Sequence, residues 1–248
     1  MTLSVIVITK NEEKSIRDCL ESVVWADEII VVDSGSTDKT VAICREYTSK
    51  VFVTGWPGFG PQKNHALEMA TSDWVLSLDA DERVTPELQA EIEAAIADPG
   101  TNVAFKIPRL SNYCGRYMHH SGWWPDYIIR LFRRDKAYFS NDLVHEHLIV
   151  NGPTKKLFKP LIHDSFRDLE DVLNKVNSYS SAGALMMYQK QKKATLASTV
   201  FHSLWAFVHT YILRAGFLDG REGLMLAVSN AEGTYYRYLK LMMMTRAK

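Results

Sequence analysis

Four short runs of apolar, largely β-branched residues shape the first part of this 248-residue chain. They are Leu3–Thr9, Glu28–Asp33, Lys50–Val53 and Trp74–Asp79. Short runs rich in Val, Ile and bulky residues are typical of strands that are buried on both faces. Stretches with apolar residues at helical spacing separate these runs. Because strands alternate with helices, the sequence predicts an α/β fold with a parallel, doubly wound sheet and right-handed crossovers.

Polar residues gather where the predicted strands end. Thr9 opens the sequence Thr-Lys-Asn-Glu, Asp33 opens Asp-Ser-Gly-Ser-Thr-Asp, and Asp79 opens Asp-Ala-Asp-Glu. The carboxyl ends of parallel strands lie at one edge of the sheet, where open α/β proteins bind their ligands. We therefore expect these clusters to form a single site together with Lys63 and Asn64.

Asp79 and Asp81 stand two residues apart at the end of the last run. In an extended chain such residues point to the same face, so their carboxylates repel unless a cation or a proton separates them. A divalent metal ion suits such a pair, because Mg²⁺ prefers one or two carboxylates together with substrate phosphates. The alternative is an acidic turn before a helix that begins near Thr85. For Asp33 and Lys63 the alternatives are a helix cap and a solvated surface charge.

Charge is balanced over the whole chain but not along it. Lys and Arg number 29, as do Asp and Glu. Residues 1–185 carry 20 basic and 26 acidic side chains, a difference of −6, whereas residues 186–248 carry 9 and 3, a difference of +6. This asymmetry predicts that the C-terminal segment meets an anionic surface. The three scattered cysteines fit neither a disulfide framework nor a zinc site, and we expect no signal peptide, so a reducing cytosol is favoured.

The Gly-x-Gly-x-x-Gly and P-loop signatures of nucleotide sites are missing. The polar clusters instead resemble the nucleotide-sugar half of family 2 glycosyltransferases, which have the GT-A fold. The segments that carry this resemblance are Thr9–Glu12, Val31–Asp38, Gln62–Asn64 and Asp79–Asp81. The second half is similar to one branch of that family, the small bacterial glucosyltransferases that act on heptose in the lipopolysaccharide core. Its matching segments are Tyr127–Arg134, Val144–Glu146 and Phe217–Gly223.

The resemblance implies roles for individual side chains. Thr9 and Asp33 would contact the uridine of a UDP-sugar, and Lys63 would contact the nucleotide, although many relatives have Arg at that position. Asp81 would bind Mg²⁺ or Mn²⁺, while Asp79 is expected to orient the ribose or to support the metal from beside it. The other side chains expected at the nucleotide-sugar site are Asn11, Glu12, Ser36 and Asn64.

The second half is expected to supply a further metal ligand and the catalytic base. His163 would complete the metal sphere, as a late histidine does in some GT-A enzymes; the alternative is a structural histidine. Transfer with inversion needs a carboxylate that accepts the proton of the attacking hydroxyl. The acids available are Asp126, Asp142, Glu146 and Asp164. We expect Glu146 to be the base and Asp126 to be the second choice, with a structural role as the alternative for Glu146.

The expected architecture is a Rossmann-like GT-A domain with a mostly parallel sheet over residues 1–165 and a helical C-terminal appendage over residues 166–248. The domain would comprise a nucleotide-sugar half (1–100) and an acceptor half (101–165). Within the appendage, Leu196–Phe217 is long enough to span a bilayer. Its Ser, Thr, His and Arg residues instead favour a helix that packs on the protein or lies in a membrane interface.

The predicted activity is transfer of one hexose, expected to be glucose, from a UDP-sugar to a lipid-linked saccharide of the lipopolysaccharide inner core, expected to be heptose. The motif Gln-x-x-Arg-Trp is absent, which favours single-sugar transfer. We expect a cytoplasmic protein that is peripheral on the inner face of the cytoplasmic membrane. Its expected partner is anionic lipid and not nucleic acid. The alternative to membrane binding is homodimerisation through the helices of the C-terminal appendage. Alternative functions are transfer from another UDP-sugar or to another glycan, sugar nucleotidyl transfer, and a non-catalytic nucleotide-sugar-binding membrane adaptor.

Overall fold

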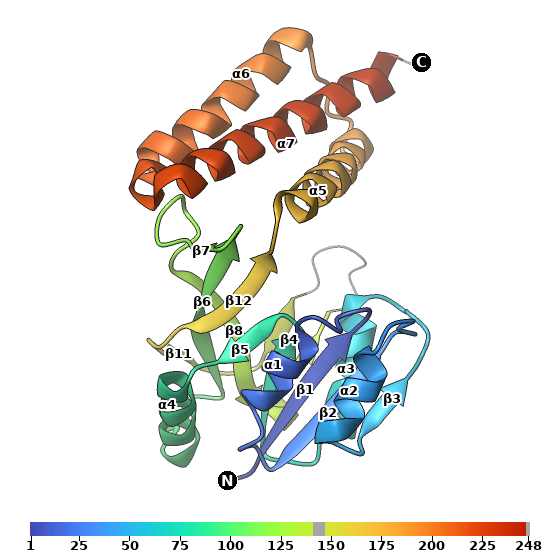
Figure 1. The fold of residues 1–248 in the computed structure, drawn as a ribbon, viewed down its shortest axis with the longest axis vertical. Coiled ribbons are helices and arrows are strands. Elements are labelled where there is room, and N and C mark those ends of the chain that lie inside the picture. The colour runs from blue at the N-terminus through green and yellow to red at the C-terminus, as the bar shows by residue number, and fades with distance from the viewer. Residues whose placement is uncertain (141–146, 247–248) are drawn as a thin grey trace. The chain divides into compact units, whose positions relative to one another are not determined.

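The computed structural model describes residues 1–140 and 147–246 (Figure 1). The chain forms two compact units. The first comprises Met1–Arg109 and Asp126–His163, and the second comprises Leu110–Pro125 and Asp164–Lys248. Residues 110–125 thus cluster with the C-terminal part, whereas the sequence-based division at residue 165 places them in the acceptor half. That division into domains stays a prediction.

The parallel part of the sheet is confirmed by the pairing of the four apolar runs. Its strands are β1 (Leu3–Thr9), β2 (Glu28–Asp33), β3 (Val51–Val53) and β4 (Trp74–Asp79), in the spatial order β3-β2-β1-β4. Every residue of β1 and β2 is buried. Strands buried on both faces explain why these runs are continuously apolar and do not alternate with polar residues.

Side chains of β1 alternate between two hydrophobic cores, one on each face of the sheet. Val5 and Val7 belong to a core that includes residues from three helices, whereas Ile6 and Ile8 belong to a core on the other face with Ala66 of α3 (Phe59–Met69). The three helices of the first core are α1 (Ile16–Glu21), α2 (Thr40–Tyr47) and α4 (Pro86–Ala97). Packing on both faces keeps the sheet edge rigid, and that edge holds the polar clusters.

Antiparallel strands extend the sheet beyond β4. β8 (Asp126–Arg133) pairs with β4, and β6 (Ala104–Tyr113) pairs with β8. β12 (Leu161–Phe166) pairs with β5 (Glu82–Val84), which places His163 opposite Glu82. The remaining short elements are β7 (Arg116–Tyr117), β9 (Ala137–Phe139), β10 (Leu148–Val150), β11 (Thr154–Lys156) and the 3-10 helix η1 (Arg134–Lys136).

The second unit is mainly helical, as the sequence pattern after Asp168 predicts. Its long helices are α5 (Leu169–Gln189), α6 (Leu196–Val208) and α7 (Gly220–Arg246), and both α5 and α6 pack against α7 (Figure 1). A π-helical turn, η2 (His209–Leu213), and a 3-10 turn, η3 (Gly216–Asp219), connect α6 to α7. A small core of Tyr113, Met118, Val172 and Leu226 lies in this unit.

Local sequence signals start the first two of these helices. The Asp168 side chain accepts a hydrogen bond from the Asp171 backbone N–H, and Thr195 forms a capping box with Ser198. Such caps provide partners for backbone N–H groups that the first helical turn leaves unpaired.

Candidate functional site

The strand ends meet at one edge of the sheet, as the sequence predicts. Thr9 is paired in register with Asp33, and Ile8 is paired with Asp79. A pocket of about 350 Å³ opens here. Its lining residues are Ile8, Thr9, Lys10, Glu12, Trp56, Phe59, Asp79, Ala80 and Asp81. The pocket therefore combines the ends of β1 and β4 with two aromatic rings from the segment before and within the first turn of α3.

The loops that follow β1 and β2 hold each other in place. The Asn11 backbone N–H donates to Ser36 Oγ at 2.8 Å, and Asn11 Oδ1 accepts from the Thr37 backbone N–H at 2.8 Å. The Glu12 backbone N–H donates to Thr40 Oγ1 at 2.8 Å. Asn11 has a positive φ of 55°, a conformation that Asn tolerates better than most residues. These contacts give Asn11 and Ser36 a structural task, and their expected contact with a nucleotide stays a prediction.

Asp33 is fully buried and organises its own turn. Its Oδ1 accepts hydrogen bonds from the backbone N–H groups of Gly35 at 2.9 Å and Ser36 at 2.8 Å, and its Oδ2 accepts from the Ser36 hydroxyl. Gly35 has a φ of 81°, which suits a residue without a side chain. Asp33 thus organises a turn and does not cap α2, whose N-cap is Lys39. Its contact with uridine stays a prediction.

Asp79 lies between two cations. Lys63 Nζ is 3.1 Å from Asp79 Oδ1, and Arg130 Nη2 donates to Asp79 Oδ2. Burial opposes ionisation of this carboxyl, but the charges of Arg130 and Lys63 hold the pKa of Asp79 well below its usual range. Lys63 is itself buried, so the alternative of a solvated surface charge is wrong for this residue.

Arg130 also neutralises a carboxylate that is completely buried. Its Nη2 donates to Glu82 Oε1 at 2.6 Å, while Glu82 Oε2 accepts from the Asp79 backbone N–H at 3.0 Å. Burial raises the pKa of Glu82, and Arg130 counteracts this rise. Burial works against the charge of Arg130, yet Asp79 and Glu82 raise its pKa above the usual value. Asp79, Glu82 and Arg130 thus form one charge network that keeps the end of β4 in place.

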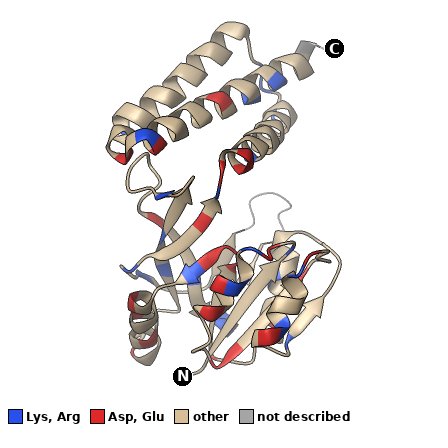
Figure 2. Ribbon diagram, in the orientation of Figure 1, with Lys and Arg blue, Asp and Glu red and all other residues tan. Residues whose placement is uncertain are grey.

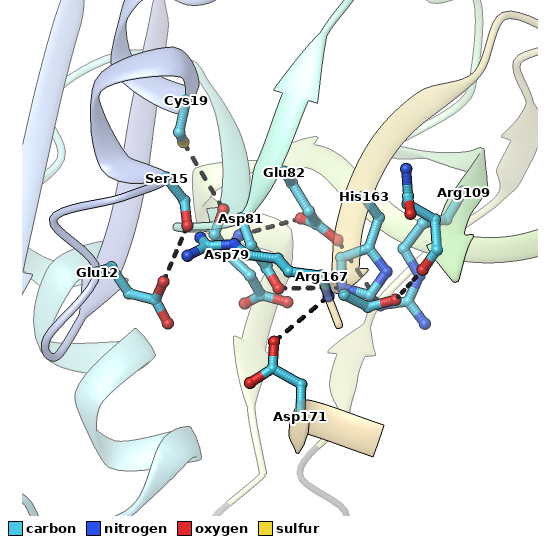
Figure 3. Close-up of polar contacts among 12 residues, drawn as sticks. Glu12, Ser15, Cys19, Asp79, Asp81, Glu82, Arg109, His163, Arg167 and Asp171 are labelled. Atoms are coloured by element: carbon cyan, nitrogen blue, oxygen red, sulfur yellow. Dashed lines mark hydrogen bonds and ion pairs between the residues drawn. The ribbon is translucent and has the colours of Figure 1, made fainter. Parts of the chain in front are cut away.

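Asp81 lies on the other side of this turn, beside His163. Its Oδ2 is 3.4 Å from His163 Nε2, and both side chains are partly exposed (Figure 3). Two ligands of one divalent cation lie roughly 3 Å apart, because each lies about 2.1 Å from the ion. The structure therefore brings together the two residues that the sequence predicts as metal ligands.

Among residues 1–140 and 147–246, no three metal-ligating side chains come close enough to hold a cation by themselves. A metal ion at Asp81 and His163 would need other oxygens, and substrate phosphates are the usual source for Mg²⁺. The residues present fit an ion that arrives with a diphosphate, and not a permanently bound structural metal.

Asn64 does not point freely into a ligand site. Its side-chain amide donates to the Phe139 carbonyl at 2.8 Å and accepts from the Phe139 backbone N–H at 2.8 Å. Asn64 therefore anchors β9 to α3, and its predicted contact with the nucleotide-sugar remains a prediction. Phe139 in turn lies under Lys63, with the ammonium 5.6 Å from the ring centroid.

A second pocket of about 390 Å³ lies on the other side of Asp79. Its lining residues are Lys63, Asp79, Arg109, Ile128, Ile129, Arg130, Phe139, His147 and Leu148. Asp79, which lines both pockets, separates a region with exposed aromatic and acidic groups from one with three basic side chains.

The candidate bases lie in different parts of the chain. Glu146 and Asp142 lie outside the described residues. Asp126 lies at the start of β8, where its Oδ2 accepts hydrogen bonds from Arg109 Nε at 3.1 Å and Nη2 at 2.7 Å. Asp164 belongs to the second unit and accepts a hydrogen bond from the Tyr117 hydroxyl at 3.1 Å.

Sequence reasoning missed Glu82 as a member of the charge network and Arg109 as a neighbour of it. Arg109 pairs with Asp126 because these two residues are opposite each other in the register of β6 and β8, and its Nη1 is 3.7 Å from Glu82 Oε1. No local signal announces such a pairing, since it depends on which strands become neighbours. For Glu82 a signal exists, because it is the third acid in the run that begins at Asp79.

Comparison with known proteins gives a consistent result. Residues 4–155 match the family model described as Glycosyl transferase family 2. An uncharacterised glycosyltransferase of Rickettsia typhi is 33% identical over 251 residues, covering 96% of this chain and 86% of the relative. The protein named lipopolysaccharide core biosynthesis glycosyltransferase LpsC, from Rhizobium meliloti, is 28% identical over 263 residues, covering 96% of this chain and 93% of the relative.

Solved structures with a similar fold include residues 1–349 of S. aureus TarS in complex with UDP. The TM-score is 0.50 at 19% identity, and the match covers 100% of this chain and 92% of TarS 1–349. The complex of the same protein with UDP-GlcNAc gives a TM-score of 0.50 at 17% identity, with the same coverage. At these identities the likeness speaks for the fold. The expected GT-A α/β architecture, a mostly parallel sheet with a helical C-terminal part, is confirmed.

Proposed function

The chain belongs to glycosyltransferase family 2, and from this premise we propose that it transfers a single hexose, with inversion, from a UDP-sugar to a saccharide acceptor. One observation carries the proposal: beside the end of β4, Asp81 lies next to His163, while Asp79 is neutralised by Lys63 and Arg130. Such an edge offers a place for a cation and a diphosphate on a rigid part of the fold.

The pocket also has a wall that suits a nucleobase. Trp56 and Phe59 line it, with ring centroids 4.7 Å apart at an interplanar angle of 88°. Both rings are about half exposed, and a flat base would cover apolar surface that is now in contact with water. A volume of about 350 Å³ lies within the usual range for small-molecule sites. UDP is the nucleotide in this proposal.

Asp81 and His163 are the residues proposed to hold Mg²⁺ or Mn²⁺. The ion, when bound, would stabilise the charge that develops on the leaving diphosphate. Lys63 and Arg130 are held in position by Asp79, so that their positive charge faces the second pocket. Asp79 thus acts mainly as a positioning residue for the two cations Lys63 and Arg130. Because it lines both pockets, it would also orient the ribose or the sugar.

The proton of the attacking hydroxyl goes to a carboxylate from the second half of the chain. Glu146 is the proposed base, and Asp126 is the alternative. Asp126 is already held by Arg109, which fixes its carboxylate at the start of β8. The separation of roles follows from chemistry, because the acids near the diphosphate are engaged with cations and the base must act on the opposite face of the sugar.

Glucose is the proposed donor sugar, and the acceptor is a heptose-containing saccharide of the lipopolysaccharide inner core. The relative LpsC, named for lipopolysaccharide core biosynthesis, matches nearly the whole chain and supports this acceptor class. A lipid-linked acceptor would place the protein at the inner face of the cytoplasmic membrane. The presence of both Asp79 and Asp81 argues against a non-catalytic adaptor.

The test is UDP release from a panel of sugar nucleotides, with and without a heptose-containing acceptor. We expect turnover with UDP-glucose that depends on both the acceptor and Mg²⁺ or Mn²⁺. Asp81→Asn should reduce turnover by about 100-fold or more, whereas Asp135→Asn, at an exposed acid on η1, should have wild-type turnover.

Two outcomes would contradict the proposal. UDP release from none of the UDP-sugars, with a folded enzyme and several glycan acceptors, would exclude the proposed activity. Full turnover of a demonstrably metal-free enzyme in excess EDTA would exclude the metal role of Asp81 and His163.

A further inference from the structure

Helix α6 turns its apolar side outward and its polar side toward the protein, the opposite of a helix on the surface of a water-soluble domain. Five apolar side chains on one side are exposed by 45% to 66%. They are Leu196, Val200, Phe201, Leu204 and Trp205. Leu196, Val200 and Leu204 are four residues apart, and so are Phe201 and Trp205, which places the five side chains on one side of the helix. We call them the α6 apolar face.

The polar residues of α6 point toward the other helices of this unit. Thr199 is fully buried, Ser203 Oγ donates to the Ala231 carbonyl of α7 at 2.9 Å, and the His202 ring stacks on Tyr238 of α7 at 4.2 Å. In a water-exposed amphipathic helix the polar side faces solvent and the apolar side packs on the core. The opposite arrangement here means that the outer environment of α6 is expected to be apolar.

The exposed apolar surface continues beyond α6. Ile212, Leu213, Phe217 and Leu218 are each exposed by more than half. Leu196–Leu213 is long and apolar enough to cross a membrane by length and composition, with a mean hydropathy of 1.2 and 11% of the segment buried. Contiguous apolar surface of this kind marks an interaction site.

Basic residues flank the segment Leu196–Leu213 at both ends, and no Lys, Arg, Asp or Glu lies within it (Figure 2). Lys190, Lys192 and Lys193 precede α6 and are exposed, and Arg214 and Arg221 follow η2 and are exposed too. The acids nearest the second end are buried: Asp219 accepts hydrogen bonds from the backbone N–H groups of His119 and His120, and Glu222 is paired with Arg221. Glu222 neutralises Arg221, so the flanking positive charges are the three lysines before the segment and Arg214 after it.

These observations select one occupant among three. A helix that crosses a bilayer alone would place Thr199, Ser203 and His202 in lipid. Here Ser203 and His202 contact α7 and Thr199 is buried, so α6 can present only one side to lipid. A second copy of the chain would bring like charges together, because both ends of the surface are basic. An anionic bilayer offers acyl chains to the apolar face and phosphates to the flanking lysines and arginines.

We infer that the α6 apolar face, extended by Ile212, Leu213, Phe217 and Leu218, inserts into the interface of an anionic membrane, with Lys190, Lys192, Lys193 and Arg214 on lipid headgroups. The C-terminal stretch Leu241 to Met244, which is also apolar, is less suited. Leu241 and Met242 are buried, and Lys240 Nζ is engaged with Asn177 and Ser180 of α5. The inference rests on the proposed function only in that a lipid-linked acceptor gives a reason for membrane binding. Membrane binding and sugar transfer can therefore be tested separately.

The experiment is co-sedimentation of the full chain with vesicles of phosphatidylethanolamine and phosphatidylglycerol, compared with phosphatidylcholine vesicles. We expect binding to the anionic vesicles at low salt and weaker binding to the neutral ones. Phe201→Gln/Leu204→Gln should reduce the partition coefficient by about tenfold or more, because two apolar side chains no longer enter the lipid. Replacing Lys190, Lys192 and Lys193 by Gln should reduce binding to the anionic vesicles and its salt dependence.

The matched control is Val24→Gln/Phe158→Gln in the first unit. Val24 and Phe158 are exposed by 62% and 71%, close to the 63% of Leu204 and 66% of Phe201, so the control changes a similar amount of exposed apolar surface elsewhere. It should bind vesicles like the wild type, and circular dichroism should show all variants folded. Fluorescence quenching by brominated lipid should depend on Trp205, with Trp205→Phe losing part of the signal.

Three results would overturn the inference. The wild type could stay in the supernatant with anionic vesicles at low salt. The α6 variant and the control could bind equally well. Sedimentation velocity could show a wild-type dimer that becomes a monomer in Phe201→Gln/Leu204→Gln without any vesicle binding, which would identify a second copy as the occupant of this face.

Discussion

Replacement of Arg130 by Met tests whether the charge network, and not the strand pairing alone, holds the end of β4. Arg130 is 8% exposed at its side chain and is the cation that contacts both Asp79 and Glu82. In its absence Asp79 keeps Lys63 at 3.1 Å, but Glu82, with a fully buried side chain, loses the cation that lies 2.6 Å away and keeps Arg109 Nη1 at the longer distance of 3.7 Å. Removal of one member of a buried ion pair costs about 3–5 kcal/mol, and we expect a loss of this size in the free energy of unfolding.

The assay is urea unfolding of the wild type, Arg130→Met, Glu82→Gln and the double variant, followed by fluorescence and circular dichroism. Because the destabilisation arises from an unpaired buried carboxylate, Glu82→Gln in the Arg130→Met background should restore about 2 kcal/mol or more. Lys136→Met is the control: its ion pair with Asp135 at 3.1 Å is exposed, so the loss should stay below about 1 kcal/mol.

The pH dependence of Arg130→Met has a defined sign. Burial raises the pKa of Glu82, and loss of Arg130 removes the charge that counteracts this rise. An acid whose pKa is higher in the folded state binds its proton more tightly there, so stability falls as the pH rises through this range. The deficit of Arg130→Met should therefore be smaller at pH 5 than at pH 8. A deficit below about 1 kcal/mol at pH 7, or additive effects of the two substitutions, would refute this reasoning.

Three further predictions concern other parts of the chain. Glu146→Gln should leave UDP-sugar binding by calorimetry intact and lower transfer by roughly 10²–10⁴-fold; near wild-type transfer, with a loss in Asp126→Asn instead, would assign the base to Asp126. Glu28 is buried, which opposes ionisation, but Lys50, Ser4 and Thr71 lower its pKa to about 2, so its contribution to stability is present above pH 4.5 and is lost as the pH falls towards 2. Glu28→Gln should flatten the pH dependence of the melting temperature in this window. An unchanged profile would contradict the assignment. Asn64→Ala should raise the rate of hydrogen exchange at the Phe139 backbone amide. Asn102→Ala should not, because the Asn102 side chain donates to the Pro99 carbonyl within its own turn. Equal protection of the Phe139 amide in both variants would show that Asn64 does not anchor β9.

The parallel part of the fold, and the edge where the site lies, follow from local sequence patterns. Runs of β-branched residues buried on both faces can only become central strands of a covered sheet, and parallel strands necessarily end at the same edge. For this reason the amino-acid sequence is enough to place Thr9, Asp33 and Asp79 together, and β1, β2 and β4 end at these residues. Helix starts such as Thr85 before α4 and Asp168 before α5 are also local, because the capping residue lies within three positions of its partner.

The surroundings of these acids, in contrast, depend on tertiary packing. Arg130 is 51 residues from Asp79 in the sequence, and it reaches Asp79 because β8 inserts antiparallel beside β4. His163 reaches Asp81 because β12 pairs with β5. Strand neighbours of this kind depend on the packing of the whole sheet, and a charged residue in the sequence carries no mark of its future partner.

The direction in which α6 faces is likewise set by tertiary packing. Periodicity in the sequence shows that a helix has a polar and an apolar side, and the usual expectation is that the apolar side packs inward. In this chain Thr199 and Ser203 are turned to the protein and Phe201 and Leu204 are turned outward. The polar groups find hydrogen-bond partners within the helical unit, and the apolar face is left for a partner that the sequence pattern alone does not reveal.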